Sequence, residues 1–411
     1  MRFDPRLLTK AVGPGRIRDA VLKTWARVRQ EPRRSGPVLR SAGRRFKHLH
    51  SRERRLFQEG LFGLVRRQRG LGTILGTDAP VALWTGWLVL EGLDPEVAND
   101  ALPGPWHGLE EEFDALGVGG PPATRLALRH SLPDHLAKRI VKSLGSDAEA
   151  FMVASDQRGP LTLRANRLRC TRDALIERLE GEGITTAPTP HAPEGLIVEG
   201  RHNLEALASF KDGWFEVQDE GSQRLANLVE PIADGQTVVD FCAGAGGKSL
   251  AIAAKGAHVT ALDVRAEALE ELDRRASRAG AHIAVTRIAT RGPLPPEVAG
   301  LRADCVLVDA PCTGTGVLRR HPEHRYLIER STVSKQAELQ GNILTRAASL
   351  VAEGGRLIYG TCSVLRAEND AVVERFLARH PSFEPVGEAL RTAPHTDGSD
   401  GFYGRVLEKG W

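Results

Sequence analysis

The strongest constraint on the fold is a regular alternation of short apolar stretches with longer amphipathic ones, which begins near residue 231. We expect strands at 236–242, 258–264, 282–288, 303–311 and 356–363, and helices at 248–256, 266–280, 334–355 and 368–380. Strands that alternate with helices predict an α/β fold with a doubly wound parallel sheet. Ligands of such sheets bind beyond the carboxyl ends of the strands, so the loops that follow the strands are the expected place for a site.

Two further segments precede this part of the chain. Residues 1–145 have helical patterning, most clearly at 51–70, where apolar residues fall on one face and arginines on the other. We expect Ser51 to cap this helix and Gly70 to end it. Within 146–230, two strand-like stretches and a helix capped by Thr171 predict a small α+β unit with a linker. The predicted domains are therefore 1–145, 146–230 and 231–411.

The charge of the chain is uneven. Residues 1–70 hold 20 Lys and Arg against 5 Asp and Glu, whereas the whole chain has a formal net charge of +4. A basic head on an acidic body suggests that the head binds a polyanion such as RNA. A solvated, arginine-rich helix face is an equally good interpretation of the composition alone.

The cysteine count bounds the redox environment. The chain has five cysteines and no CxxC pair, and its histidines show no metal-ligand spacing, so neither a disulfide framework nor a metal site is expected. We expect Cys305 and Cys170 to be structural. The first residues lack a signal-peptide core, and no uncharged run reaches about 18 residues. The expectation is a soluble, cytoplasmic, monomeric protein without a membrane partner.

A glycine-rich turn, "DFCAGAGGKS", follows the first strand of the alternating region. It is not a Walker A loop, because the position that requires the first glycine is Cys242. A nicotinamide fingerprint would need a third glycine where Ser249 stands. Asp263 ends the next strand and could accept both hydroxyls of a ribose. The turn and this acid fit either a nicotinamide nucleotide or S-adenosylmethionine.

Two cysteines near the ends of later strands separate these alternatives. "DAPC" places Asp309 and Cys312 at the fourth strand, and "YGTCS" places Cys362 at the fifth. Hydride transfer needs no thiol, whereas methylation of cytosine C5 does. A thiolate that adds to C6 makes C5 nucleophilic, and an acid near N3 stabilises the adduct. The pattern therefore favours S-adenosylmethionine and a covalent route to 5-methylcytosine.

These motifs, together with "VDAPCTGTGVLRRHPEHRY", "YGTCSVLRAEND", "LTLRAN" and "WFEVQDEGSQ", resemble the RNA cytosine-5 methyltransferases of the RsmB/Sun type, the NOL1/NOP2/Sun family. The resemblance covers the chain from about residue 125 to its end. It implies a Rossmann-like S-adenosylmethionine methyltransferase sheet, preceded by a small α+β unit. More weakly, residues 51–70 resemble the NusB-like helical RNA-binding domain of bacterial members that act on small-subunit rRNA.

The resemblance also implies roles for single residues. Cys362 matches the nucleophile, Cys312 the residue that assists release of the methylated base, and Asp309 the acid that contacts the cytosine and the cofactor. Asp263 matches the ribose-binding acid, and Lys248 a lysine near Asp309. The cofactor loop comprises Cys242, Ala243, Gly244, Ala245, Gly246, Gly247 and Lys248. The expected RNA-binding residues are Arg164, Asn166, Arg319, Arg320 and His321.

The chain departs from the family pattern at two places. Ala245 stands where the loop commonly has proline. After the third strand, Ala289 and Thr290 stand where an acid near the adenine is usual, so the adenine amine would need another acceptor such as a backbone carbonyl.

The leading hypothesis is methylation of cytosine C5 in RNA, most simply 16S rRNA. The alternatives are another RNA (tRNA or 23S rRNA), DNA cytosine-5 methylation, in which the Pro-Cys thiol attacks, and a non-catalytic RNA-binding assembly factor.

Overall fold

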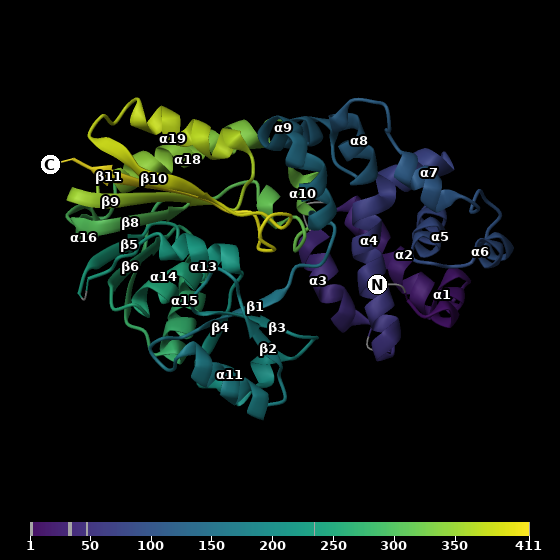
Figure 1. Cartoon of the computed structure of the whole chain (residues 1–411), viewed down its shortest axis with the longest axis horizontal. Coiled ribbons are helices and arrows are strands. Elements are labelled where there is room, and N and C mark those ends of the chain that lie inside the picture. The colour runs from purple at the N-terminus through teal and green to yellow at the C-terminus, as the bar shows by residue number, and fades with distance from the viewer. Residues whose placement is uncertain (1–2, 32–34, 47, 234, 411) are drawn as a thin grey trace. The chain divides into compact units, whose positions relative to one another are not determined.

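The computed structural model describes residues 3–31, 35–46, 48–233 and 235–410. They form two compact units (Figure 1). The first comprises Met1–Gln157 and Leu318–Arg330, and the second comprises Arg158–Val317 and Ser331–Trp411. The chain therefore leaves the second unit after Val317, contributes 318–330 to the first, and returns.

The first unit is helical in its described residues. Its core gathers the apolar faces of the helices around large side chains such as Trp25, Phe57 and Trp84, which are fully buried. The α-helices before residue 158 are α1 (Pro5–Val12), α2 (Arg16–Gln30), α3 (Ser35–Arg45), α4 (Ser51–Leu75), α5 (Pro80–Leu90), α6 (Pro95–Ala101), α7 (Leu109–Ala115), α8 (Pro122–Arg129), α9 (Asp134–Leu144) and α10 (Ala148–Ser155).

Helix α4 corrects both predicted boundaries of the 51–70 helix. His50, not Ser51, occupies the N-cap, and its backbone N–H donates to Glu53 Oε2 over 3.1 Å. The helix continues through Gly70 to Leu75 and ends at Gly76, whose φ of 62° is left-handed. Gly70 has a packing role instead, because a Cβ at this position would lie 2.7 Å from the ring of Phe113.

Segment 318–330 packs within the first unit through buried polar groups. It contains α17 (His324–Leu327), and the side chain of Arg325 is 0% exposed. This guanidinium donates to Asp156 Oδ1 over 3.1 Å, to the carbonyl of Pro322 over 3.0 Å and to the carbonyl of His130. The other oxygen of Asp156 lies 2.7 Å from His130 Nδ1. An internal ion pair therefore fixes the segment to the end of α10.

The second unit begins with a small four-stranded sheet of order β2-β3-β1-β4. As predicted, Thr171 caps α11, and its side chain accepts from the N–H of Ala174 over 3.2 Å. The elements here are β1 (Leu161–Ala165), α11 (Arg172–Gly181), β2 (Thr186–Pro188), β3 (Gly195–Val198), α12 (Ala208–Lys211), β4 (Phe215–Val217) and α13 (Glu220–Asn227).

A seven-stranded sheet of order β10-β11-β9-β8-β5-β6-β7 follows, and its five predicted strands are parallel. The Rossmann-like prediction is thus confirmed. The elements are β5 (Thr237–Asp240), α14 (Gly247–Ala253), β6 (His258–Asp263), α15 (Ala266–Ala279), β7 (Ile283–Arg287), α16 (Pro296–Ala299), β8 (Ala303–Asp309), α18 (Thr332–Ala348), β9 (Val351–Thr361), α19 (Asp370–Leu377), β10 (Phe383–Arg391) and β11 (Tyr403–Lys409).

The sheet differs from the prediction at its β9 side. The helix expected to reach residue 355 ends at Ala348, because Val351 already pairs with Ala303 of β8. Strands β10 and β11, which were not predicted, add an antiparallel hairpin at this edge.

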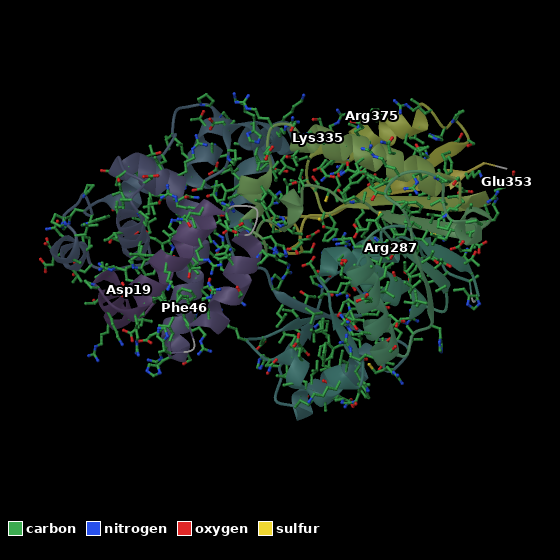
Figure 2. All side chains as sticks on the ribbon, turned by 180° about the vertical axis from the view of Figure 1, so that it is seen from behind. Asp19, Phe46, Arg287, Lys335, Glu353 and Arg375 are labelled. Carbon is green, nitrogen blue, oxygen red and sulfur yellow. The ribbon has the colours of Figure 1, made fainter. Side chains whose placement is uncertain are left out.

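Helices cover both faces of the large sheet (Figure 1). Apolar residues of α14 and α15 pack on one face around Leu250 and Leu272, and those of α18 and α19 pack on the other around Leu344 and Phe376. Charged side chains such as Lys335 and Arg375 lie on the exposed sides of α18 and α19 (Figure 2). Both faces are therefore buried, and the strand ends remain for binding.

Within the described residues, no single helix is both long and apolar enough to cross a membrane; α4 and α5 meet that test only as a pair bent by 104°.

The buried ion pair generates a stability prediction. Arg325→Met removes the fully buried guanidinium that donates to Asp156 and leaves this carboxylate beside His130 and the more distant Arg67, whose Nη1 lies 3.8 Å away. Loss of this buried pair should cost about 3–5 kcal/mol at neutral pH. Burial raises the pKa of Asp156, but the charge of Arg325 and the hydrogen bond from His130 outweigh it and hold the pKa well below its usual range. The stabilisation is therefore present above the ordinary aspartate pKa and is lost as pH falls.

Urea unfolding followed by tryptophan fluorescence measures this difference, since four of the six tryptophans lie in the first unit. The difference in free energy of unfolding between the wild type and Arg325→Met should become smaller as pH falls below about 4, because Asp156 then becomes protonated in the unfolded chain. Arg330→Met, which changes an exposed side chain of the same segment, should cost less than about 0.5 kcal/mol. Equal stability of the two variants would contradict the prediction.

Candidate active site

The candidate site lies at the carboxyl ends of the parallel strands. Asp240 ends β5, Asp263 ends β6 and Asp309 ends β8. In the pairing of β8 with β9, Asp309 is aligned with Gly360. Because parallel strands end at the same edge, the loops that follow Asp309 and Gly360 begin beside each other, and each carries one of the two cysteines.

The glycine-rich loop after β5 needs two left-handed residues. Gly244 and Gly246 have φ values of 55° and 83°, and a Cβ on Gly246 would lie 2.5 Å from Leu272. Gly246 also caps α14, which starts at Gly247. The turn from strand into helix therefore depends on glycine, and it leaves the backbone bare at the strand edge, as close approach of a nucleoside cofactor requires.

Asp263 is held in place by its neighbours. Its Oδ2 accepts from the N–H of Gly244 over 2.8 Å, and its Oδ1 accepts from the backbone N–H of Arg265 over 2.9 Å and from that residue's Nε over 3.1 Å. Burial raises the pKa of Asp263, but the hydrogen bonds outweigh it and the pKa lies below its usual value. The carboxylate is thus ionised and tied to the loop, a suitable acceptor for ribose hydroxyls.

Lys248 and Asp309 form an ion pair next to this loop. Lys248 Nζ lies 2.6 Å from Asp309 Oδ2, and the exposed fractions of the two side chains are 11% and 28%. Burial lowers the pKa of Lys248, but the charge and hydrogen bond of Asp309 outweigh it and raise the pKa above its usual value. The site therefore holds a permanent ammonium beside a carboxylate.

The two predicted thiols meet at this edge. Cys312 Sγ and Cys362 Sγ lie 3.3 Å apart although 50 residues separate them. The hydrogen bond with Cys362 is the main cause that raises the pKa of Cys312 well above its usual value, and burial adds to it. Cys312 therefore keeps its proton and can donate it in a hydrogen bond to the sulfur of Cys362.

The other three cysteines are placed as packing residues. Cys305 is fully buried within β8, and burial raises its pKa to about 12. Burial also raises the pKa of Cys242 well above its usual value, so this thiol of the cofactor loop stays protonated. Cys170 is half-buried, and its Sγ lies 3.4 Å from the carbonyl of Trp214.

Arg164 and Asn166 are not placed to contact RNA, which corrects their assignment. Both are buried. Arg164 Nε donates to Gln218 Oε1 over 2.6 Å, and Asn166 Nδ2 donates to the carbonyls of Gly213 over 2.7 Å and Ala279 over 2.8 Å. Because Ala279 ends α15, Asn166 joins the small sheet to the methyltransferase part of the unit.

Arg319, Arg320 and His321 belong to segment 318–330 of the first unit. Arg319 is buried, and its carbonyl accepts from Arg66 Nη2 over 3.3 Å. His321 Nδ1 lies 3.7 Å from Glu323 Oε1. Of the three, only Arg320 and His321 have partly exposed side chains.

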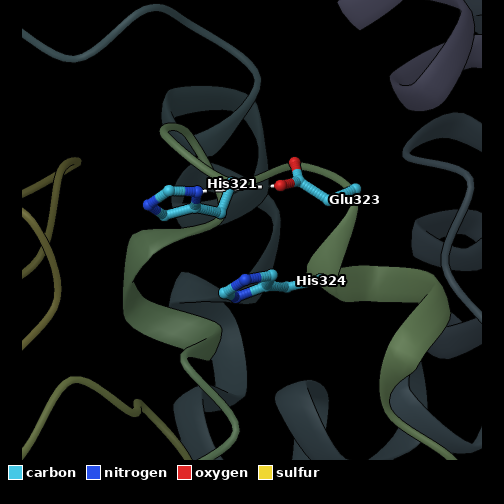
Figure 3. A group of neighbouring side chains, drawn as sticks. All are labelled: His321, Glu323 and His324. Carbon is cyan, nitrogen blue, oxygen red and sulfur yellow. Dashed lines mark ion pairs between the residues drawn. The ribbon is translucent and has the colours of Figure 1, made fainter. Parts of the chain in front are cut away.

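His321, Glu323 and His324 bring three metal-binding side chains together, and sequence spacing alone did not signal this (Figure 3). Their donor atoms lie within 4.8 Å of one another. The two imidazoles are stacked, with planes 15° apart and ring centres separated by 5.0 Å. Because an imidazole binds a metal in its own ring plane, nearly parallel rings do not direct their nitrogens at one ion. The contacts are those of an ion pair and a stacked pair.

Four further residues support the site and were not found from the sequence. Arg275 Nη1 donates to the carbonyl of Ala245 over 2.6 Å and so fixes the loop at the position where the family commonly has proline. Arg346 Nη1 donates to the carbonyls of Ala289 and Thr290, which occupy the place of the absent acid. Asp240 accepts from Ser249 over 2.7 Å. Glu368 binds the residues that follow both thiols.

Asp240 has an unusual electrostatic environment. Burial raises its pKa to about 6, although the hydrogen bond from Ser249 opposes the shift. Its Oδ1 is buried and accepts no hydrogen bond from the described residues. The sequence signal that could have identified Asp240 is its position, because it is an acid at the end of the first strand of the alternating region.

Comparison with known proteins identifies the family. A family described as "16S rRNA methyltransferase RsmB/F" matches residues 226–408, and a "Methyltr_RsmF/B-like, ferredoxin-like domain" matches residues 132–205. In fold, the chain is similar to the crystal structure of PH0851, with a TM-score of 0.75, 24% identity and coverage of 100% of both chains.

Two relatives extend the comparison to sequence. The chain is 35% identical to the ribosomal RNA small subunit methyltransferase B of Sodalis glossinidius (strain morsitans), over 68% of this chain and 66% of that enzyme. It is 34% identical to the enzyme of the same name from Serratia proteamaculans (strain 568), over 68% of this chain and 67% of that enzyme. The chain thus spans about two thirds of the length of these relatives. By these matches the chain belongs to the RsmB/F methyltransferase family.

Proposed function

We propose that the protein methylates carbon 5 of cytosine in 16S rRNA through a covalent cysteine adduct. The observation that carries the proposal is the pair of thiols, Cys312 and Cys362, 3.3 Å apart at the carboxyl edge of the sheet. Cytosine C5 is a poor nucleophile, and addition of a thiolate to C6 supplies the electron density that C5 needs to accept a methyl group. The small-subunit rRNA enzymes among the relatives support the choice of RNA.

The methyl donor is S-adenosylmethionine, which supplies an electrophilic methyl group when bound. The residues present fit this cofactor, because the loop at Gly244 and Gly246 exposes its backbone and Asp263 is an ionised acceptor at the end of β6. We assign the ribose hydroxyls to Asp263 and the rest of the cradle to the loop from Cys242 to Lys248. Asp309 contacts the cytosine and the methionine end.

We assign the attack on C6 to Cys362. The S–H of Cys312 stabilises the thiolate of Cys362 by donating a hydrogen bond to its sulfur. Addition at C6 places negative charge on the pyrimidine ring, and the ammonium of Lys248, held by Asp309, can balance this charge by donating a hydrogen bond to the ring.

Release of the base follows from a change at Cys312. Once the sulfur of Cys362 is bonded to C6, it no longer holds the charge and hydrogen bond that raise the pKa of Cys312. Burial still raises the pKa of Cys312 at this stage, but its side chain is partly exposed, so it can pass its proton to solvent and then serve as the base for the C5 hydrogen. The electrons of the C5–H bond form the C5–C6 double bond, and Cys362 leaves as a thiolate. The same pair of thiols thus supports attack first and elimination second.

RNA binding is assigned to exposed basic side chains of the first unit and to Arg320 and His321. Part of the basic head is already neutralised inside the protein, since Glu53 Oε1 lies 2.7 Å from both Lys10 Nζ and Arg16 Nη2. The RNA-facing charge is therefore smaller than the sequence count. A different RNA, a non-catalytic assembly role and the DNA-type order of attack are the alternatives that the following experiments separate.

The first experiment concerns the thiols. Cys362→Ala should abolish methylation and leave no covalent RNA, because the nucleophile is gone. Cys312→Ala should allow attack and methyl transfer but stall elimination, so that the protein carries RNA through denaturing electrophoresis when S-adenosylmethionine is present. Cys170→Ala, which removes a thiol outside the site, should behave as the wild type. Trapping by Cys362→Ala alone would establish the DNA-type order, and full activity of both variants would refute the covalent route.

The second experiment concerns the cofactor. Asp263→Asn replaces a charged acceptor by a neutral amide, and loss of charge-assisted hydrogen bonds should weaken binding of S-adenosylmethionine about 10- to 100-fold. Isothermal titration calorimetry measures the change. Asp273→Asn, on the exposed side of α15, is the control and should bind as the wild type does. Equal affinities of the two variants would argue against the ribose assignment.

The third experiment concerns RNA. Replacing the exposed residues Arg6, Lys23, Arg45 and Arg52 by glutamine should reduce the log–log dependence of RNA affinity on salt by about 0.7 for each phosphate that these side chains neutralise in the wild type. The matched control replaces four exposed cations of the second unit, Arg287, Arg291, Lys335 and Arg375. A slope that changes only in the control set would mean that the basic head is a solvated surface.

A further inference from the structure

Glu368 is a buried carboxylate that binds both thiol-bearing loops. It is 0% exposed and ends the short 3-10 helix Arg366–Glu368 before α19. Its Oε1 accepts from the N–H of Thr313 over 2.9 Å and from Gln340 Nε2 over 3.2 Å. Its Oε2 accepts from the hydroxyl of Ser363 over 2.6 Å and from the hydroxyl of Thr313. All of these donors are electrically neutral.

In each loop, a residue that donates to Glu368 stands at the position directly after the cysteine. Thr313 directly follows Cys312, and Ser363 directly follows Cys362. One carboxylate therefore holds the residue after each thiol, although the two loops come from different strands. Burying a charge among neutral donors is costly unless its hydrogen bonds are satisfied, so the four bonds that Glu368 accepts fix the loops strongly to one geometry.

Neighbouring contacts restrict the same two loops. The hydroxyls of Thr315 and Ser363 lie 3.0 Å apart, and the N–H of Gly316 donates to the carbonyl of Cys362 over 2.9 Å. Asn369 binds on both sides of the cysteine: its Oδ1 accepts from Thr361 Oγ1 over 2.6 Å, and its Nδ2 donates to the carbonyl of Ser363 over 2.8 Å. Among these ties, Glu368 alone reaches both residues that follow a cysteine.

We propose that Glu368 is a positioning residue that sets the distance between the sulfurs of Cys312 and Cys362. This positioning role rests on the proposed function, because attack by one thiol and elimination assisted by the other require the two sulfurs to reach the same base in turn. Glu368 touches neither sulfur in this role; it acts through Thr313 and Ser363. Misplacement of either sulfur by about 1 Å is enough to cost about 100-fold in rate.

The test detects whether the two thiols are close together, and it does not depend on methylation activity. Phenylarsine oxide condenses with two adjacent thiols to form a cyclic dithioarsenite and one molecule of water, so it captures the pair only when both sulfurs face each other. In the full-length protein, Glu368→Ala should weaken this capture at least tenfold. It should also lower kcat about 100-fold while the KM for RNA and the affinity for S-adenosylmethionine stay close to those of the wild type.

Two variants separate hydrogen-bond geometry from charge and from general damage. Glu368→Gln keeps the shape and an acceptor for the N–H of Thr313, and the hydroxyls of Thr313 and Ser363 can rotate to accept from its amide. This variant should retain most of the dithiol capture. Glu374→Ala removes an exposed carboxylate of α19 and should leave capture and kcat unchanged.

The outcomes distinguish this proposal from the proposed function. If Glu368→Ala loses capture of phenylarsine oxide while the wild type shows no RNA methylation, the positioning role of Glu368 would be supported and the proposed reaction would be refuted. Normal capture in a folded Glu368→Ala, or equal loss in the glutamine and alanine variants, would overturn positioning by hydrogen bonds. If Glu368→Ala does not fold, Ser363→Ala decides the matter, because it removes the hydrogen bond from Ser363 to Glu368 together with the contacts of the same hydroxyl with Thr315 and Leu365. Unchanged capture in that variant would overturn the proposal.

Discussion

The parallel pairing of β8 with β9 is the constraint on which the site depends. It aligns Asp309 with Gly360, and each cysteine follows its strand by only a few residues. A register shift by one residue would turn every side chain of β9 to the opposite face. The other neighbour of β8 is β5, which carries the glycine-rich loop. A single strand thus brings the cofactor loop, the acid and both thiols to one edge, and the hydrogen bonds around Glu368 refine that arrangement.

The sequence predicted most of this sheet because its central strands are buried on both faces and form continuous apolar runs. The strands β10 and β11 were missed for the opposite reason. In β10, which forms one edge of the sheet, Phe383 is the one buried residue, so no clear apolar pattern marks the strand. The helix before β9 was predicted too long because Val351 and the glycines that follow belong to the strand, and only pairing with β8 reveals this.

The sequence predicted the site residues that lie at strand ends, but it did not predict the hydrogen bonds that join residues from distant parts of the chain. Strand order brings Cys312 and Cys362 to one edge, which local sequence can indicate. The partners of Asn166 and Glu368 lie on other elements, at Ala279 and Thr313. Local sequence likewise cannot separate a buried arginine such as Arg164 from one that faces solvent. Long-range hydrogen bonds of buried polar groups were therefore the part of the site that required a structure.

Segment 318–330 has a consequence for how the chain folds as it is synthesised. Asp156 and its environment leave the ribosome long before Arg325, because most of the second unit is translated between them. At typical elongation rates this interval lasts on the order of 10–30 s. During that time the buried acid lacks the guanidinium of Arg325, and the helical unit lacks the segment 318–330 that belongs to it, so the unit cannot reach its final packing. The first unit is therefore the first to be translated but is completed only after residue 330. A nascent chain released before residue 325 would carry a helical unit without Arg325.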